Sequence, residues 1–303
     1  ALKSQGCGII VCLGHLGIDN ESMGNRSIDL LNAVKGIDVF IDGHSHSDLE
    51  AVKAATGGTG KVGDTLLTST GTKLAGIGCV VISKDGITAT TIPTSELTTT
   101  PDKTVADRAA AIQKQIDDDY GTVFAKTTYE LNGTKAPNGN RDGETNLGDL
   151  ITDALVWGAK QNGEAVDAAV TNGGGIRADE KAGYWTFKTC KQVSPFGNVA
   201  CLMSVTGKQI QDALEFAARF AGTEKENGGF LHVAGASYEI HADISNTVQT
   251  DEKNVWIGSA TGTPRVQNVK IYNKASGTYE PLDESKTYAL AGMNYTLRNL
   301  GDG

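Results

Sequence analysis

The sequence predicts an α/β (α+β) protein with two domains joined by a helix. Its 303 residues would fill roughly two domains of about 150 residues each. Two apolar runs, at residues 8–13 and 37–41, each end in glycine-containing polar stretches, as strands do, and a helical pattern at 27–35 lies between them. The 38 glycines indicate that many loops connect such elements.

The first domain is expected over residues 1–98. The run Gly8–Leu13 is continuous and apolar, which is typical of a strand covered on both faces. The helix and the strand Ile37–Ile41 complete a β–α–β unit, so the two strands are expected to be parallel neighbours whose carboxyl ends meet at one sheet edge. Further strands are expected at 64–69, 76–83 and 87–93, the last two joined by a hairpin turn.

Histidines follow both strands of this unit. His15 comes after the first strand, and His44 and His46 come after the second. Because ligands gather at the carboxyl ends of strands in open α/β sheets, we expect one cluster there. Neutral imidazole binds zinc, manganese, iron and nickel, so the cluster predicts a transition-metal site without naming the metal. The alternative is a polar turn whose histidines are satisfied by hydrogen bonds, and this structural role is the one expected for His232 and His241 on their strands.

The segment 99–120 is expected to form a linker helix between the domains. Thr100 is the expected N-cap, with Pro101 in the first turn. A narrow apolar seam repeats at helical spacing, at Val105, Ala109, Ile112 and Ile116. Because charged residues dominate the remaining positions, the helix is expected to be mostly exposed.

The second domain, residues 121–303, is expected to mix strands and helices. The predicted strands lie at 122–131, 167–170, 199–205, 230–233 and 237–241. One predicted helix begins at Glu144, with Leu147, Leu150, Ile151, Ala154 and Leu155 on its inner face. Another spans about 207–221, with Ile210, Ala213, Leu214 and Ala217 on its inner face.

A glycine loop follows the 167–170 strand, with the sequence Asn172-Gly-Gly-Gly-Ile-Arg177. Three glycines expose backbone N–H groups and let a ligand approach closely. Arg177 carries a planar fork of donors that matches phosphate or carboxylate. A glycine run is often only a mobile loop, but Asn172 and Arg177 on either side favour a binding role.

Composition excludes several classes of function. The net charge of −9 and the pI near 5.1 argue against a nucleic-acid-binding surface and favour small ligands or metals as partners. No apolar run approaches the ~20 residues needed to span a membrane. Five cysteines are too few and too scattered for a disulfide framework, although a Cys190–Cys201 bridge is compatible with the sequence.

Six motifs together resemble the 5′-nucleotidase / UDP-sugar hydrolase family. They occur in the order Gly14–Gly17, Gly43–His46, Glu144–Gly148, Asn172–Arg177, Pro195–Asn198 and Gly301–Gly303. The resemblance implies a partial four-layer αββα metallophosphatase domain, a linker helix and a C-terminal α+β nucleoside-binding domain. It also implies metal-dependent hydrolysis of nucleotide phosphomonoesters and an extracellular, periplasmic or cell-surface location.

The resemblance further assigns roles to individual residues. His15 and His44 would bind one of two divalent metal ions (zinc, manganese or similar), and His46 would bind the other. The residues that would hold the nucleotide are Arg141 and Arg177 for phosphate, Phe196 and Tyr295 for stacking on the base, Asn172 and Asn198 for the base edge, Asp302 for the ribose, and Gly174 in the glycine loop.

The sequence departs from the family at its beginning. The family's Asp-x-His, bridging Asp and Asn-His motifs do not precede His15, so the catalytic His–Asp pair has no counterpart and the catalytic residues stay unassigned. We therefore expect a chain truncated at both ends that does not assemble the two-metal site alone. The alternatives are a non-enzymatic nucleoside- or nucleotide-binding module, a 2′,3′-cyclic-nucleotide phosphodiesterase relative, and a sulfur-oxidation hydrolase on the same scaffold. The preferred nucleotide and the oligomeric state are left open.

Overall fold

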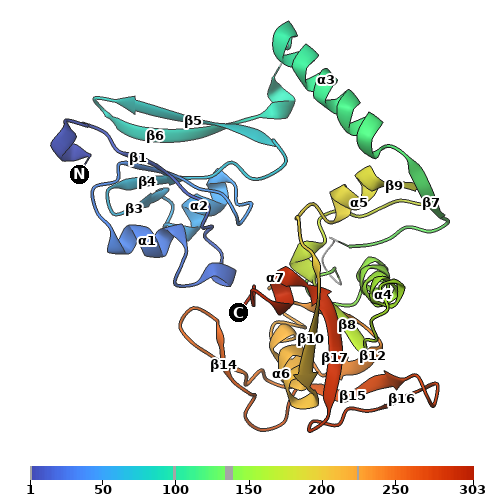
Figure 1. Ribbon diagram of the computed structural model, residues 1–303. Coiled ribbons are helices and arrows are strands. Elements are labelled where there is room, and N and C mark those ends of the chain that lie inside the picture. The colour runs from blue at the N-terminus through green and yellow to red at the C-terminus, as the bar shows by residue number, and fades with distance from the viewer. Residues whose placement is uncertain (1, 98–99, 134–138, 224) are drawn as a thin grey trace. The chain divides into compact units, whose positions relative to one another are not determined.

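The structure is a computed structural model that describes residues 2–97, 100–133, 139–223 and 225–303. Contacts between residues divide the chain into two compact units. The first comprises residues 1–102 and 251–254, and the second comprises residues 103–250 and 255–303. Most of their helices and strands are labelled in Figure 1.

The first unit is built on a four-stranded sheet in the order β1-β2-β4-β3. Its strands are β1 (Val11–Leu13), β2 (Val39–Ile41), β3 (Lys61–Val62) and β4 (Thr65–Thr68). The strands β1, β2 and β4 run parallel, and β3 pairs antiparallel with β4. Helix α1 (Ser27–Ala33) connects β1 to β2, and α2 (Leu49–Ala55) connects β2 to β3. The predicted β–α–β unit with parallel strands is therefore confirmed.

The prediction that the first strand is covered on both faces is wrong. Val11 and Leu13 are 50% and 77% exposed, because β1 lies at the edge of the sheet. The core of this unit instead surrounds the next two strands, where Phe40, Leu67 and Val52 are buried. An apolar run therefore indicated the strand but not its burial, which depends on neighbours distant in sequence.

A separate hairpin completes the first unit. Strands β5 (Gly76–Ser83) and β6 (Gly86–Pro93) pair antiparallel along their whole length, as the sequence predicted. The hairpin reverses at Lys84 and Asp85, and Gly86 follows with φ of 129°. Strand β6 contacts β4 and α2. Single 3-10 turns lie at Lys3–Gln5, Asn20–Ser22 and Thr94–Glu96.

Helix α3 (Lys103–Tyr120) is the helix expected between residues 99 and 120. It begins at Lys103, so Thr100 is not its N-cap, contrary to the prediction. Residues 100–102 have no helical assignment, so Asp102 stands directly before the first helical residue. None of its described side chains is buried, and Val105 is 68% exposed. The predicted exposure is therefore confirmed.

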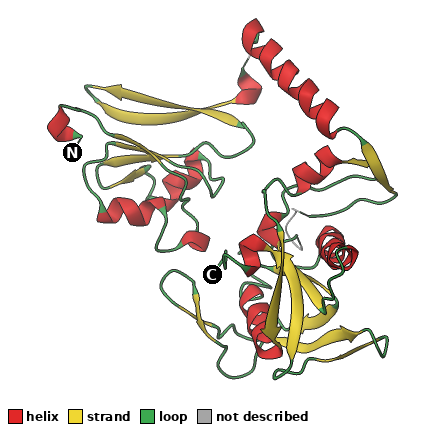
Figure 2. Cartoon of the chain, viewed as in Figure 1, coloured by secondary structure: helices red, strands yellow, loops and turns green. Residues whose placement is uncertain are grey.

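The second unit contains a four-stranded mixed sheet in the order β10-β17-β8-β11. Figure 2 draws the strands of the chain in yellow. Its strands are β8 (Ala168–Asn172), β10 (Ala200–Thr206), β11 (Leu231–Ala234) and β17 (Thr287–Met293). The central pair β17 and β8 is parallel, and the two outer pairs are antiparallel. The sequence predicted β8, β10 and β11 but not the central strand β17.

Smaller sheets surround this one in the second unit. Strands β12 (Ala236–Ile240), β15 (Val266–Asn273) and β16 (Thr278–Pro281) form an antiparallel sheet. Two further pairs are β7 (Val123–Thr127) with β9 (Gly183–Thr186), and β13 (Gln249–Thr250) with β14 (Trp256–Gly258). The strand expected over 122–131 is therefore shorter than predicted, because Leu131 forms only an isolated bridge with Glu180.

Helices pack on these sheets and close the core of the second unit. Helix α4 (Asn146–Gln161) lies on β8, β11 and β17, and α6 (Gly207–Ala217) lies on β10 and β15. The shorter helices are α5 (Phe187–Val193), α7 (Asn294–Leu297) and the 3-10 turn Gly173–Gly175. Leu147, Ile210 and Leu214 are buried as predicted. The buried face of each helix is narrower than predicted, because Leu150 and Ala154 on α4 and Ala213 on α6 are exposed.

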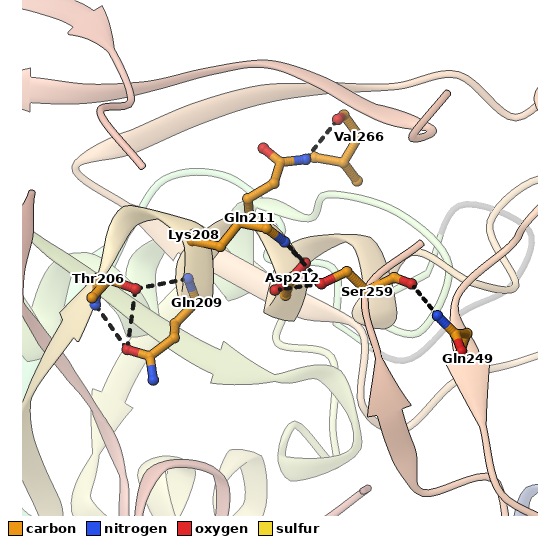
Figure 3. A network of polar contacts seen from close by, with 8 residues as sticks. All are labelled: Thr206, Lys208, Gln209, Gln211, Asp212, Gln249, Ser259 and Val266. Atoms are coloured by element: carbon orange, nitrogen blue, oxygen red, sulfur yellow. Dashed lines mark hydrogen bonds and ion pairs between the residues drawn. The ribbon is translucent and has the colours of Figure 1, made fainter. Parts of the chain in front are cut away.

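The start of α6 anchors a loop of the second unit (Figure 3). Lys208 and Asp212 form an ion pair one helical turn apart. The Ser259 hydroxyl accepts from Lys208 Nζ at 2.9 Å and donates to Asp212 at 3.0 Å. Gln249 Nε2 donates to the Ser259 carbonyl at 3.1 Å, so the β13–β14 region is tied to this helix.

Among the helices that the structure describes, none has the length and apolar character needed to cross a membrane.

Candidate functional site

In the first unit, the ends of β1 and β2 bring His15 and His44 together. Their ring centroids are 5.2 Å apart, and the rings meet edge to face at 63°. Gly43 allows this approach, because a Cβ there would lie 3.0 Å from His15 Nδ1. Both histidines are exposed, so their rings are accessible to an ion from solvent.

Asp42 holds the loop that carries His15. One of its carboxylate oxygens accepts from the backbone N–H of Leu16 at 2.9 Å and of Gly17 at 3.3 Å. The other accepts from the Ser27 hydroxyl. The carboxyl end of β2 therefore fixes the loop after β1 through side-chain-to-backbone bonds, which accounts for the proximity of the two rings.

His46 lies on the same turn as His44. Both have positive φ, 75° for His44 and 55° for His46, a conformation that is uncommon outside glycine and often found at functional sites. Within the described ranges, no group of three or more His, Cys, Asp and Glu side chains is arranged to hold a metal. Imidazole is a donor that zinc and manganese accept, and His15 and His44 are two such side chains placed next to each other.

In the second unit, β8 runs into the glycine loop. The N–H groups of Gly173 and Gly174 donate to the carbonyls of Phe230 and Gly228, each at 2.8 Å. These two N–H groups are bonded within the protein, so the expectation that the loop exposes them to a ligand is wrong. The glycines instead permit close packing, since a Cβ on Gly174 would lie 3.1 Å from Gly228.

Asn172, Tyr295 and Asp302 form one cluster. Asn172 Nδ2 donates to one oxygen of Asp302 at 3.0 Å, although the two residues are 130 positions apart. Tyr295 donates its phenolic hydrogen to the other oxygen at 3.0 Å. Gly301 lies against the tyrosine ring, where a Cβ would come within 2.3 Å of it. The structure thus assembles three of the predicted nucleotide-binding residues.

Arg177 and Phe196 form a second pair. The guanidinium carbon lies 5.9 Å from the ring centroid, which is cation–π distance. The Arg177 backbone N–H donates to the Val193 carbonyl at 2.8 Å and fixes the base of the side chain. Phe196 is 50% exposed and Tyr295 is 37% exposed, so part of each ring is accessible to a ligand.

Two predicted nucleotide-binding residues remain, Arg141 and Asn198. Arg141 borders the glycine loop, since its Cα would lie 3.4 Å from a Cβ on Gly173, and it pairs with Glu226 at 3.6 Å. Asn198 is half-buried in the loop between α5 and β10.

All five cysteines lie within the described ranges and are free thiols, so Cys190 and Cys201 form no bridge. Burial raises the pKa of the Cys190 thiol.

Sequence reasoning missed Asn140. It is 2% exposed, and its side-chain amide donates to the carbonyls of Gly173 at 2.6 Å and Ile176 at 3.0 Å. Its backbone carbonyl lies 2.9 Å from Nε2 of His232, so His232 is hydrogen-bonded as predicted, and it is also buried. No periodicity marks such a residue. The available signal was a polar amide directly before Arg141.

A family model described as "5′-nucleotidase, C-terminal domain" matches residues 123–303. The chain belongs to this family. A solved structure of a 5′-nucleotidase precursor from Thermus thermophilus is 25% identical, with a TM-score of 0.63 over 100% of this chain and 57% of that one. A putative 5′-nucleotidase from Staphylococcus aureus shares the fold, with a TM-score of 0.63 at 20% identity over 99% of this chain and 57% of that one. The predicted fold class is therefore confirmed.

Curated relatives carry related names. The trifunctional nucleotide phosphoesterase protein YfkN of Bacillus subtilis is 30% identical over 76% of this chain and 15% of its own length. The NAD 5′-nucleotidase of Haemophilus influenzae is 25% identical over 100% of this chain and 56% of its own length. The chain thus spans about half, or less, of the length of these relatives.

Proposed function

We propose that the protein takes part in metal-dependent hydrolysis of nucleotide phosphomonoesters and that its second unit binds the nucleotide. The observation that carries this proposal is the Asn172–Asp302–Tyr295 cluster, in the segment that the family model covers. It combines a carboxylate, an amide and an aromatic ring, which are the groups that recognise a ribose and a base.

Asp302 would accept the ribose hydroxyls. An ionised carboxylate only accepts hydrogen bonds, and the bonds from Asn172 and Tyr295 show that Asp302 serves as such an acceptor. The bonds from these donors also hold the carboxylate in a fixed orientation. Ribose hydroxyls are donors of the kind that such an oriented carboxylate accepts.

The base and phosphate would bind to the side chains around this carboxylate. Tyr295 and Phe196 would stack on the base, and Asn172 and Asn198 would contact its edge. Arg177 and Arg141 would hold phosphate oxygens, as the planar guanidinium suits. Gly174 would keep the glycine loop close to Gly228.

His15, His44 and His46 are proposed as this chain's metal ligands, with the first two on one ion. Neutral imidazole donors at the separation observed for His15 and His44 fit zinc or manganese. Two such ions, when bound, would activate a water and stabilise charge on the phosphoryl oxygens. Asp42 would keep the His15 loop in place. By family relationship, we also propose an extracellular, periplasmic or cell-surface location, which cell fractionation would test.

Calorimetric titration of the purified chain with adenosine and AMP tests nucleotide binding. We expect both to bind, and Phe196→Ala to weaken each about tenfold, since stacking of a base on an aromatic ring is worth about 1–3 kcal/mol. Tyr279→Ala is the matched control, because Tyr279 is an exposed ring on β16 that meets Tyr272 edge to face. Absence of binding, or equal effects of both variants, would contradict the proposal.

A non-enzymatic binding module is the second candidate. It is favoured because His15 and His44 are only two adjacent imidazoles, and no group of three or more possible metal ligands is found among the described residues. Release of phosphate from AMP that requires Mn²⁺ or Zn²⁺ would support hydrolysis by this chain. Adenosine binding in EDTA without phosphate release under any metal would support the binding module instead.

A further inference from the structure

We infer that Asn140 is a positioning residue that sets the placement of Arg141 and Arg177, and that His232 holds Asn140 for this purpose. The inference rests on the proposed function, in which the two arginines hold the phosphate. It assigns a role in ligand binding to a buried amide and a buried imidazole that do not themselves touch the nucleotide.

A single side chain fixes both ends of the glycine loop. Asn140 Nδ2 donates to the carbonyl of Gly173, at the start of the loop, and to that of Ile176, at its end. The backbones at Asn140 and Gly173 are in very close contact, because a Cβ on Gly173 would lie 1.8 Å from the backbone carbonyl oxygen of Asn140. Since a buried amide with two partners has little freedom, the loop is held in one conformation.

The same amide lies one residue from each arginine. Arg141 directly follows Asn140, and Arg177 directly follows Ile176, whose carbonyl the amide contacts. The Asn140 side chain therefore fixes the distance between the backbones that carry the two guanidinium groups. A phosphate held by both groups depends on that distance, because charge-assisted bonds require close and aligned donors.

His232 determines where Asn140 lies. A carbonyl oxygen only accepts, so Nε2 of His232 carries the hydrogen and donates to Asn140. Burial lowers the pKa of His232, against the opposing effect of its hydrogen bond to Asn140, and so favours the neutral ring. His232 lies on β11, paired with Thr171 of β8, and the Nδ1 side of its ring faces Gly148 of α4, where a Cβ would come within 2.0 Å. Strand and helix packing therefore fixes the donor.

The test compares three histidine variants of the whole chain by calorimetric titration with AMP and adenosine. His232→Leu removes the donor, and His232→Gln keeps an N–H donor. His241→Leu is a control at a half-buried histidine paired with Glu239. We expect His232→Leu to weaken AMP binding about tenfold and adenosine binding by about twofold or less, since only the phosphate contacts are displaced. His232→Gln should restore most of the AMP affinity, and His241→Leu should match the wild type.

The ratio of AMP to adenosine affinity separates positioning from a purely structural role. If His232→Leu melts at a lower temperature but keeps the wild-type ratio, the inference is overturned and the proposed function stands. If the wild type binds neither compound, the proposed function fails and the inference fails with it. Should His232→Leu not fold, His232→Asn replaces it, because its shorter amide cannot reach Asn140 and the same ratio decides.

Discussion

Tyr295 donates its phenolic hydrogen bond to Asp302, seven residues further along the chain, at 3.0 Å. Asp302 has φ of 69°, so the backbone there is held in the left-handed region that few non-glycine residues adopt. The short helix α7 and the turn after it thus deliver a carboxylate and an aromatic ring to the same place. Asn172, at the end of a strand from a distant part of the sequence, completes the cluster.

Tyr295→Phe is expected to weaken adenosine binding moderately. The variant keeps the ring for stacking and loses the hydroxyl that donates to Asp302, so we expect a loss of about 0.5–1.5 kcal/mol in binding free energy. Tyr295→Ala should lose more, since it also removes the ring. Titration calorimetry measures both variants. Equal losses for Phe and Ala would show that the hydroxyl, and not the ring, carries the contribution of Tyr295.

Asp42→Ala should both destabilise the first unit and weaken its metal binding. The variant leaves the N–H groups of Leu16 and Gly17 without their carboxylate, which we expect to cost about 2–3 kcal/mol. Circular dichroism during urea unfolding measures the stability, and zinc titration measures the binding at His15 and His44.

The control for Asp42 is Asp48→Ala, which removes the N-cap of α2. Loss of a cap costs about 1 kcal/mol, and we expect zinc affinity to be unchanged. Unaltered zinc affinity in Asp42→Ala would refute the positioning role proposed for this carboxylate.

Gly173→Ala should strongly destabilise the second unit, whereas Gly197→Ala should not. A methyl group at residue 173 would meet the Asn140 carbonyl at 1.8 Å, and no heavy atom lies within 4 Å of the corresponding position at residue 197. We expect a loss of about 2–3 kcal/mol for the first variant and little change for the second. All three tryptophans lie in the second unit, so their fluorescence during urea unfolding reports on that unit alone.

Asp149 should make the second unit less stable as the pH rises. Burial, followed by the charges of Glu144 and Asp153, raises the pKa of Asp149 from 3.8 to about 6. Between these two values the folded state binds more protons than the unfolded state, so stability falls as pH increases through this window. Asp149→Asn removes the titrating group and should flatten the fall.

Calorimetric melting of the wild type and of Asp149→Asn at about pH 4 and about pH 8 tests this dependence. The variant should gain melting temperature relative to the wild type only at the higher pH. Asp243→Asn, at an exposed position in the same unit, serves as the control. A constant difference between wild type and Asp149→Asn at both pH values would contradict the assigned pKa.

Local patterns in the sequence predicted most of the elements. The β–α–β unit, the hairpin of β5 and β6, helix α4 and the strand before the glycine loop follow from apolar periodicity and turn residues, because these depend on neighbours in the chain. Strand β17 escaped prediction even though it lies at the centre of a sheet. Its small and mixed side chains carry no strong alternation, and its burial comes from β10 and β8 on either side.

The sequence by itself determined which residue types stand after each strand, and therefore the set of histidines, arginines and aromatic residues available for a site. Only the tertiary structure decided which of these residues meet. It joined Asn172 to Asp302 across 130 positions, placed Asn140 and His232 behind the glycine loop, and left Val11 and Leu13 exposed. The physical reason is that hydrogen bonds and burial arise between segments distant in the chain, and a local pattern cannot report which segments become neighbours.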